Sequence, residues 1–292
     1  MLCVCATPIG NLGDVTLRVL EVLQTADLIA AEDTRRTRRL LAHHDIHTPL
    51  TSFHEHNEAG KAGQLLARLR AGETVALVSD AGMPLVSDPG ARLVADAVRE
   101  GLDVVVLPGA SAVITALVVS GLAGEGGFRF VGYLPRRRAL LQESWRRWRR
   151  EGGPIVAFES PRRLARSLEA LAAPAPDAAA AVCRELTKLH EGVDRGTLGE
   201  LAARYSSADV EVRGEITLVL DAGPGEARQA VDQEAAAETA RALLGKRLSK
   251  RDAAAALTIC LGLRHRDAER LVRAVSEEDG ASRPQTGRRL VD

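Results

Sequence analysis

Short apolar runs alternate with stretches of helical periodicity over the first part of the 292-residue chain. The runs are rich in Val, Ile and Leu, which is typical of buried strands in a parallel sheet. We therefore expect strands at residues 2–6, 28–31, 74–78 and 104–107, and helices at 16–24, 35–43, 61–70 and 91–100. Alternating strands and helices predict an α/β fold, in which helices cover the faces of a parallel sheet.

A second series of strand and helix patterns runs from residue 128 to residue 221, and a helical series follows it. We expect strands at 128–132, 155–158, 180–184 and 215–220, and helices at 139–150, 161–172, 198–205, 231–244, 250–261 and 267–275. Residues 222–229 contain Gly223, Pro224 and Gly225 and are typical of a linker. The chain is thus expected to form an N-terminal α/β lobe (1–122), a second α/β lobe (123–222), a C-terminal helical module (230–276) and a disordered tail (277–292).

Three of the predicted helix starts carry capping signals. Asp88 precedes Pro89, and Ser160 precedes Pro161, so each pair has the pattern of an N-cap followed by proline at the first helical position. Ser249 opens the sequence Ser-Lys-Arg-Asp, which is typical of a capping box.

Composition narrows the class of protein without identifying it. The formal net charge is zero, which argues against a protein that binds nucleic acid over its whole surface and still allows a local basic face. The four cysteines are too few and too scattered for a disulfide framework, and Cys3 and Cys5 alternate along a predicted strand toward one side of its core. No signal peptide and no apolar run long enough to cross a bilayer are evident, so we expect a reduced, cytoplasmic protein.

Three Gly/Pro-rich turns follow predicted strands of the first lobe. They lie at residues 7–14, 79–90 and 108–112, and each stands at the carboxyl end of its strand. Ligands of open α/β sheets bind at those ends, so the three turns are expected to converge on one crevice. Each turn alone is weak evidence, because none matches a dinucleotide-binding or phosphate-binding fingerprint.

Seven longer segments occur in one order along the chain. They are ATPIGNLGDVTLR (6–18), AEDTRRTRRLL (31–41), SFHEHNE (52–58), LVSDAGMPLVSDPG (77–90), PGASA (108–112), ESPRRL (159–164) and RELTKLHE (184–191). Together they resemble the small-subunit ribosomal RNA methyltransferase I branch of the tetrapyrrole methylase superfamily. Two mild departures are Met83, where threonine is more common, and Arg162, near a position where histidine is common.

The resemblance implies a two-lobed fold with a parallel-sheet first lobe, a mixed-sheet second lobe and a small helical module. It also implies S-adenosylmethionine as the methyl donor, a homodimer, and 2′-O-methylation of a cytidine, position 1402 of 16S ribosomal RNA in the small ribosomal subunit. We expect the donor site to use Pro8, Gly10, Asp80, Ala81, Gly82, Ser111, Ala112, Glu159 and Glu215.

Methyl transfer to a hydroxyl needs a base, or a charge that stabilises the developing oxyanion. The candidates are Glu32, Asp33, the segment His54–Glu58, Glu159, Arg184, Glu185, Lys188 and Glu191. We favour a carboxylate from Glu32, Asp33 or Glu185, with Lys188 or Arg184 stabilising charge. A metal is not expected, because the His54-x-His56 pair has no third ligand at a diagnostic spacing.

Arginine clusters are the candidate RNA contacts, because arginine pairs well with phosphate. The predicted set is Arg35, Arg36, Arg38, Arg39, Arg136, Arg137, Arg138, Arg162 and Arg163. Trp145 and Trp148 lie among further arginines and are expected to pack into a core rather than to stack on RNA bases. The alternatives are a small-molecule methylase of the same superfamily, acting on a tetrapyrrole or on diphthine, and a non-catalytic RNA-binding assembly factor.

Overall fold

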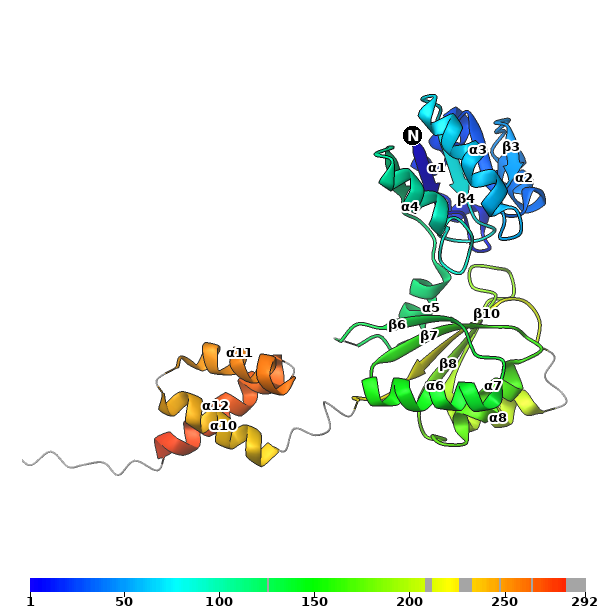
Figure 1. Ribbon diagram of the computed structural model, residues 1–292. Helices are drawn as coiled ribbons and strands as arrows, with labels where there is room; N and C mark the ends of the chain where they lie inside the picture. Colours follow the sequence, from blue (N-terminus) through cyan, green and yellow to red (C-terminus); the bar gives the residue numbers. More distant parts are fainter. Residues whose placement is uncertain (125, 208–211, 226–232, 247, 264, 282–292) are drawn as a thin grey trace, which may run out of the picture. The chain divides into compact units, whose positions relative to one another are not determined.

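The computed structural model describes residues 1–124, 126–207, 212–225, 233–246, 248–263 and 265–281 (Figure 1). The chain divides into two compact units. The first comprises Met1–Ser144 with Pro154–Asp221, and the second comprises Trp145–Gly153 with Ala222–Asp292. The first unit contains two five-stranded sheets, and the second contains the three C-terminal helices.

The first sheet is wholly parallel, as predicted. Its strands are β1 (Leu2–Cys5), β2 (Leu28–Ala31), β3 (Leu50–Ser52), β4 (Val75–Val78) and β5 (Val104–Leu107), in the order β3-β2-β4-β1-β5. Leu2 on the central strand β1 lies opposite Val75 of β4 and Val104 of β5. Because all strands point the same way, their carboxyl ends meet at one edge.

Helices cover both faces of this sheet. They are α1 (Leu17–Thr25), α2 (Thr34–His43), α3 (Glu58–Arg70) and α4 (Ala91–Arg99), and a short 3-10 helix η1 (Leu12–Asp14) precedes α1. Leu23 of α1 and Leu41 of α2 pack with Cys3 and Cys5, so these two cysteines face one core as predicted. The other face packs against Leu65 of α3 and other apolar residues of α3 and α4.

The second sheet is mixed, as the resemblance implied. Its strands are β6 (Arg129–Tyr133), β7 (Pro154–Glu159), β8 (Ala179–Arg184), β9 (Gly192–Thr197) and β10 (Ile216–Asp221), in the order β6-β7-β10-β8-β9. Only β6 and β7 are parallel, and the other neighbours are antiparallel.

Helix α5 (Ala112–Ser120) follows β5 in the chain but packs against the second sheet, where Ala116 meets Val156 and Val219 in one buried cluster. Helices α7 (Leu164–Ala172) and α8 (Leu198–Ser206) lie on the opposite side of this sheet from α5 (Figure 1).

Two predicted helix starts are wrong. Helix α4 begins at Ala91 with Gly90 as its N-cap, at a φ of 120°, rather than at Pro89 after an Asp88 cap. Helix α7 begins at Leu164, because the N–H groups of Arg163 and Leu164 first close a turn on the carbonyl of Ser160, at 3.0 and 3.1 Å. In both cases, a proline-containing turn precedes the helix instead of opening it.

The second unit contains α10 (Gln233–Gly245), α11 (Lys250–Leu261) and α12 (His265–Ala281), which share a core around Ala240, Leu257 and Val272. Ser249 caps α11, since its hydroxyl accepts the Asp252 N–H at 3.1 Å as predicted. Helix α12 continues through Ala281, beyond the predicted start of disorder, and residues 282–292 lie outside the described residues. Part of the predicted linker, residues 226–229, also lies outside them.

Helix α6 (Arg138–Glu151) runs from the first unit into the second. Trp145 and Trp148 on this helix are buried, which confirms their predicted place in a core. Among the described residues, no helix is both long enough and apolar enough to span a membrane.

Candidate functional site

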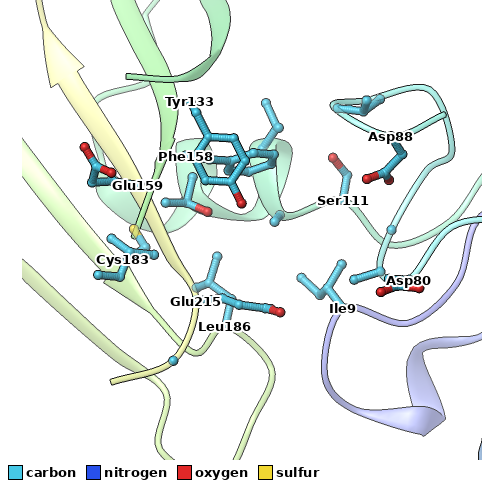
Figure 2. A pocket seen from close by; sticks show the side chains of 18 of the residues that line it. Ile9, Asp80, Asp88, Ser111, Tyr133, Phe158, Glu159, Cys183, Leu186 and Glu215 are labelled. Atoms are coloured by element: carbon cyan, nitrogen blue, oxygen red, sulfur yellow. The ribbon is translucent and has the colours of Figure 1, made fainter. Parts of the chain in front are cut away.

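A cavity of about 370 Å³ lies where residues of the two sheets meet in the first unit (Figure 2). Its volume falls within the range of small-molecule and cofactor sites, roughly 300–1,000 Å³. The residues that line it are Ile9, Glu32, Arg36, Asp80, Ala81, Gly82, Met83, Val86, Asp88, Ser111, Ala112, Val113, Tyr133, Phe158, Glu159, Ser160, Pro161, Cys183, Leu186, Gly214, Glu215, Ile216 and Thr217. All three predicted turns contribute, so their convergence on one crevice is confirmed.

The turns after β1 and β4 are joined through their backbones. The N–H of Thr7 donates to the carbonyl of Gly82 at 2.8 Å, and the N–H of Gly82 donates back to the carbonyl of Thr7 at 3.0 Å. The Thr7 hydroxyl also donates to the carbonyl of Ser79 at 3.2 Å. Gly82 has a φ of +80°, which an L side chain rarely adopts, so glycine is needed where this pairing occurs.

The rest of the loop after β4 is held in unusual backbone conformations. Leu85 and Ser87 have φ values of 73° and 72°, in the left-handed region that is costly for residues other than glycine. Gly90 ends the loop, and its N–H donates to Glu58 Oε1 at 3.2 Å. Such strain concentrates at ligand sites, because the surrounding structure must hold it in place.

The second sheet contributes an aromatic wall to the cavity. The rings of Tyr133 and Phe158 are 5.7 Å apart in an edge-to-face arrangement, and Phe158 meets Phe130 in the same way at 5.0 Å. Tyr133 and Phe158 lie together at one side of the cavity in Figure 2. This wall offers flat apolar surface to a planar ring.

The cavity is strongly acidic. Five carboxylates line it, from Glu32, Asp80, Asp88, Glu159 and Glu215, against one arginine. Burial and the neighbouring Glu32 carboxylate raise the pKa of Asp88 to about 7. Burial and the Asp80 carboxylate likewise raise the pKa of Glu32. Crowded carboxylates of this kind favour a cationic ligand, whose charge relieves their mutual repulsion.

Glu159 is the most deeply buried of these carboxylates. Its Oε1 accepts the N–H of Ser160 at 2.7 Å, and its Oε2 accepts the hydroxyl of Ser167 at 2.6 Å. Arg163 lies 3.2 Å from the same Oε2 and also donates to the carbonyl of Leu134 at 2.7 Å. Glu159 therefore ties β7 to α7 while it lines the cavity, and Arg163 serves as its counter-ion.

The favoured catalytic carboxylates lie in different surroundings. Glu32 lines the cavity, where its Oε2 accepts the N–H of Asp80 at 3.4 Å. Asp33 does not line it, because its carboxylate caps α2 and bonds Arg35 at 2.7 Å. These hydrogen bonds from Arg35 hold the pKa of Asp33 well below its usual range.

Glu185 and Lys188 form an ion pair beside the cavity, and Glu215 contacts both residues. Glu185 Oε1 accepts Lys188 Nζ at 2.8 Å and the N–H of Glu215 at 2.8 Å, and Lys188 Nζ also lies 3.0 Å from Glu215 Oε2. Burial alone would raise the pKa of Glu185, but these hydrogen bonds outweigh it and leave that pKa lowered. The same carboxylates outweigh desolvation at Lys188 and raise the pKa of its ammonium group.

A second cavity of about 330 Å³ adjoins the first. Pro8 and Gly10, which we expected in the donor site, line this second cavity, as do Arg36, Arg39 and Lys188. The other predicted donor residues line the first. The turn after β1 therefore serves both cavities, with Ile9 common to them.

The predicted RNA-contact arginines fall into two groups. Arg35, Arg36, Arg38, Arg39, Arg136, Arg137, Arg138 and Arg162 are exposed. Arg163 is partly buried and engaged with Glu159, as described above. Arg36 and Arg39 line cavities, whereas Arg136 and its two neighbours stand where β6 leads into α6.

The segment at residues 52–58 supports the loop after β4. Asn57 accepts the His54 N–H at 2.8 Å, and Lys61 Nζ donates to the carbonyl of Ser52 at 2.7 Å. This network fixes the start of α3, from which Glu58 reaches Gly90. His54 and His56 lie 6.0 Å apart between ring centres, and no group of three potential metal ligands occurs among the described residues.

Asp88, Tyr133 and Phe158 are lining residues that our sequence interpretation missed. The pattern at Asp88 favoured a helix cap, although its place in the second Gly/Pro-rich turn, residues 79–90, was a usable signal. Tyr133 and Phe158 end ordinary strands, and no glycine-rich turn marks them. Only the pairing of β6 with β7, at Tyr133 and Phe158, brings the two rings together.

Comparison with known proteins agrees with this architecture. Residues 1–202 match the family model described as Tetrapyrrole (Corrin/Porphyrin) Methylases. Proteins named Ribosomal RNA small subunit methyltransferase I are similar at 44% identity in Halalkalibacterium halodurans and 48% in Mesorhizobium japonicum, each alignment covering 76% of this chain and 75% of the relative.

Among solved structures, a uroporphyrin-III C-methyltransferase from Thermus thermophilus, complexed with S-adenosylhomocysteine, aligns with a TM-score of 0.53 at 20% identity. The alignment covers 77% of this chain and 97% of that structure, so the fold is shared. The family match spans the first sheet, all strands of the second sheet except β10, and most of the cavity lining. The chain therefore belongs to the tetrapyrrole (corrin/porphyrin) methylase family.

Proposed function

We propose that this protein uses S-adenosylmethionine to methylate the ribose 2′-oxygen of a cytidine in 16S ribosomal RNA, at position 1402. The observation that carries the proposal is an acidic cavity at the carboxyl ends of a parallel sheet, beside a second cavity lined by cations. Supporting it are the membership in a family of methylases and the names of relatives at 44% and 48% identity.

The first cavity suits this donor in charge and shape. S-adenosylmethionine carries a sulfonium and an ammonium group against one carboxylate, so it is a net cation. The carboxylates of Asp80 and Asp88 would hold the cationic portion, and the wall of Tyr133 and Phe158 would face the adenine. The small residues Ala81 and Ala112 leave room between these two ends.

When bound, this cofactor supplies an electrophilic methyl group, so the protein has to orient the reactants and receive a proton. Glu32 is the strongest proton acceptor among the carboxylates that we favour. It lines the cavity, and its pKa is raised by burial and by the Asp80 carboxylate, which makes it a stronger base than an ordinary glutamate. Glu185 would act through Lys188, whose ammonium group can stabilise negative charge on the oxygen.

The test is methyl transfer from labelled S-adenosylmethionine to small ribosomal subunits that lack the modification. We expect label in 16S RNA, and we expect the adjacent phosphodiester to resist alkaline cleavage, which needs a free 2′-hydroxyl. Label found only in a small molecule would refute the RNA assignment and favour a small-molecule methylase. No donor binding by calorimetry would refute the enzyme and favour an assembly factor.

A homodimer and a cytoplasmic location belong to the same proposal. The first sheet ends in the edge strand β5, where Val106 is 54% exposed, and Val118 on α5 is 70% exposed. Exposed apolar residues on an edge strand are typical of an association surface. Sedimentation velocity should give a dimer, and a Val106→Lys variant should shift it toward monomer. A ribosomal substrate would place the protein in the cytoplasm.

A further inference from the structure

The two adjoining cavities differ in the sign of their lining charge. The first is lined by five carboxylates and one arginine, and the second by Arg36, Arg39 and Lys188 with two carboxylates, Asp80 and Glu215. Both Asp80 and Glu215 also belong to the first cavity. Arg36 is shared as well, so the unshared cations, Arg39 and Lys188, lie on one side of a common boundary and the unshared carboxylates on the other.

Lys188 is held rigidly at this second cavity. Its ammonium group lies within 3.0 Å of Glu185 and Glu215 oxygens, and the loop that carries it contains two residues of positive φ, Glu185 at 50° and Thr187 at 64°. The stem of Lys188 runs over Gly10, where an added Cβ would collide with Lys188 Cγ and lie 2.8 Å from Thr187 Oγ1. The N–H of Asn11 also donates to Thr187 Oγ1, at 3.1 Å.

Within the part of the chain that the structure describes, Arg39 has no counter-ion. Its side chain is exposed and lines the second cavity, and none of the hydrogen bonds or ion pairs among the described residues involves its guanidinium. An unpaired arginine beside a fixed lysine provides the donors that a phosphate group accepts.

Arg36 stands at the boundary between the cavities. Its Nε lies 3.5 Å from Asp80 Oδ2, and its NH1 lies 3.7 Å from Glu215 Oε1. Both contacts are long and the side chain is 55% exposed, so each ion pair is weak. Arg36 can therefore leave these partners at little energetic cost when another anion arrives.

We propose that the second cavity receives the sugar and phosphate of the nucleotide to be methylated. Arg39 and Lys188 bind its phosphate. The side chain of Arg36 lies between this acceptor site and the donor site and can change its position when a ligand binds. This inference rests on the proposed function, since it assigns the acceptor of that reaction. Charge complementarity sorts the ligands, because a cationic donor prefers the acidic cavity and a phosphodiester prefers the cationic one.

The test compares Arg39→Gln with Arg92→Gln, a control on α4 whose exposed side chain lines neither cavity. For Arg39→Gln, we expect the KM for small ribosomal subunits to rise about tenfold, with the donor Kd unchanged within about twofold. The salt dependence of subunit binding should also fall by about one unit of slope. Arg92→Gln should leave all three quantities unchanged.

Gly10→Ala tests the site without removing a charge, because the added methyl displaces Lys188. Gly13→Ala is its control in the same turn, where a Cβ would lie 3.2 Å from the Asn11 side chain alone. We expect Gly10→Ala to raise the KM for subunits and to lower the thermal midpoint, because the added Cβ would also lie 3.0 Å from the carbonyl of Leu186. Gly13→Ala should raise the KM much less. If the Gly10→Ala variant is unfolded at the assay temperature, the KM of Arg39→Gln decides whether the second cavity binds the acceptor.

Failure of the proposed function can be distinguished from failure of the acceptor-site assignment. If the wild-type protein transfers no methyl group to subunits, then the proposed function fails. If the wild type is active and Arg39→Gln keeps its KM, the acceptor site lies elsewhere and this inference is overturned. An equal loss of donor affinity in Arg39→Gln would also overturn it, because the second cavity would then belong to the donor site.

Discussion

The two sheets of the first unit build their shares of the cavity in different ways. The parallel sheet contributes residues of the turns that follow its strands, such as Ile9 after β1, Asp80 after β4 and Ser111 after β5. The mixed sheet contributes mainly side chains from the strands themselves, such as Phe158 and Glu159 of β7 and Thr217 of β10. One half of the site is therefore built by turns at strand ends, and the other largely by residues within strands.

The difference follows from strand direction. In a parallel sheet all carboxyl ends lie at one edge, so successive loops meet there whatever their side chains are. In the mixed sheet, all neighbouring strands except β6 and β7 run in opposite directions, so individual residues of each strand reach the cavity. The first half should consequently be sensitive to glycine replacement, and the second half to the loss of single buried polar groups.

Gly90→Ala should produce the largest effect. Gly90 has a φ of +120°, and an added Cβ would lie 2.8 Å from Leu77 Cδ2, so backbone strain and overpacking act together. We expect a loss of about 2–5 kcal/mol in the free energy of unfolding, measured by urea denaturation.

Gly60→Ala is the matched control, because Gly60 lies within α3 and an added Cβ would meet nothing within 4 Å. It should leave stability unchanged or raise it by up to about 1 kcal/mol. Equal losses in the two variants would mean that the loop after β4 relaxes freely, and the contrast between the two halves of the site would disappear.

Glu159→Gln tests the other half of the site. The substitution keeps the shape but removes the charge that pairs with Arg163 and accepts the Ser167 hydroxyl in a buried setting. We expect a loss of about 1–3 kcal/mol in the free energy of unfolding. Glu143→Gln, at an exposed position of α6, should change it by less than about 0.5 kcal/mol. If both variants unfold at the same urea concentration, the buried carboxylate is not structural.

Asp88 should make donor binding depend on pH. Its pKa is raised to about 7, so the carboxylate is mostly protonated at pH 6 and mostly ionised at pH 8. A cationic donor prefers the ionised form, and its affinity should therefore rise with pH across this window. At pH 8, Asp88→Asn should lower the affinity for S-adenosylmethionine at least tenfold, about 1.4 kcal/mol, as measured by calorimetry.

The pH profile separates charge from shape. Asp88→Asn should bind the donor with nearly the same affinity at pH 6 and pH 8, because the titrating group is gone. A variant that keeps the wild-type slope would assign the pH dependence to another group, such as Glu32, whose pKa is also raised.

The sequence predicts the elements that local patterns mark and misses those that depend on contacts between distant segments. Strands β2 and β5 and helix α11 lie at the predicted residues, because long apolar or strongly capped patterns mark them. Strands β3 and β9 were missed. Leu50–Ser52 is short and two of its three residues are polar. Gly192–Thr197 has two glycines and a single large apolar residue, so only pairing with their neighbours makes these segments strands.

The site divides in the same way. Gly82 and Ser111 were predicted, because turns at strand ends are visible as local sequence. The approach of Tyr133 to Phe158, and of Arg36 to Glu215, depends on contacts between distant segments. Those contacts are products of tertiary packing, which periodicity and turn chemistry do not encode.

Arg136, Arg137 and Arg138 should show the smallest effect, because they lie outside both cavities. All three are exposed where β6 leads into α6, so replacing them with Ala should not change the thermal midpoint. We expect a roughly three- to tenfold loss of affinity for small ribosomal subunits at physiological salt, with a flatter salt dependence. Donor affinity should stay at the wild-type value, and an equal fall in donor affinity would place this cluster in the donor site. The mixed sheet would then shape the cofactor pocket through charge as well as through packing.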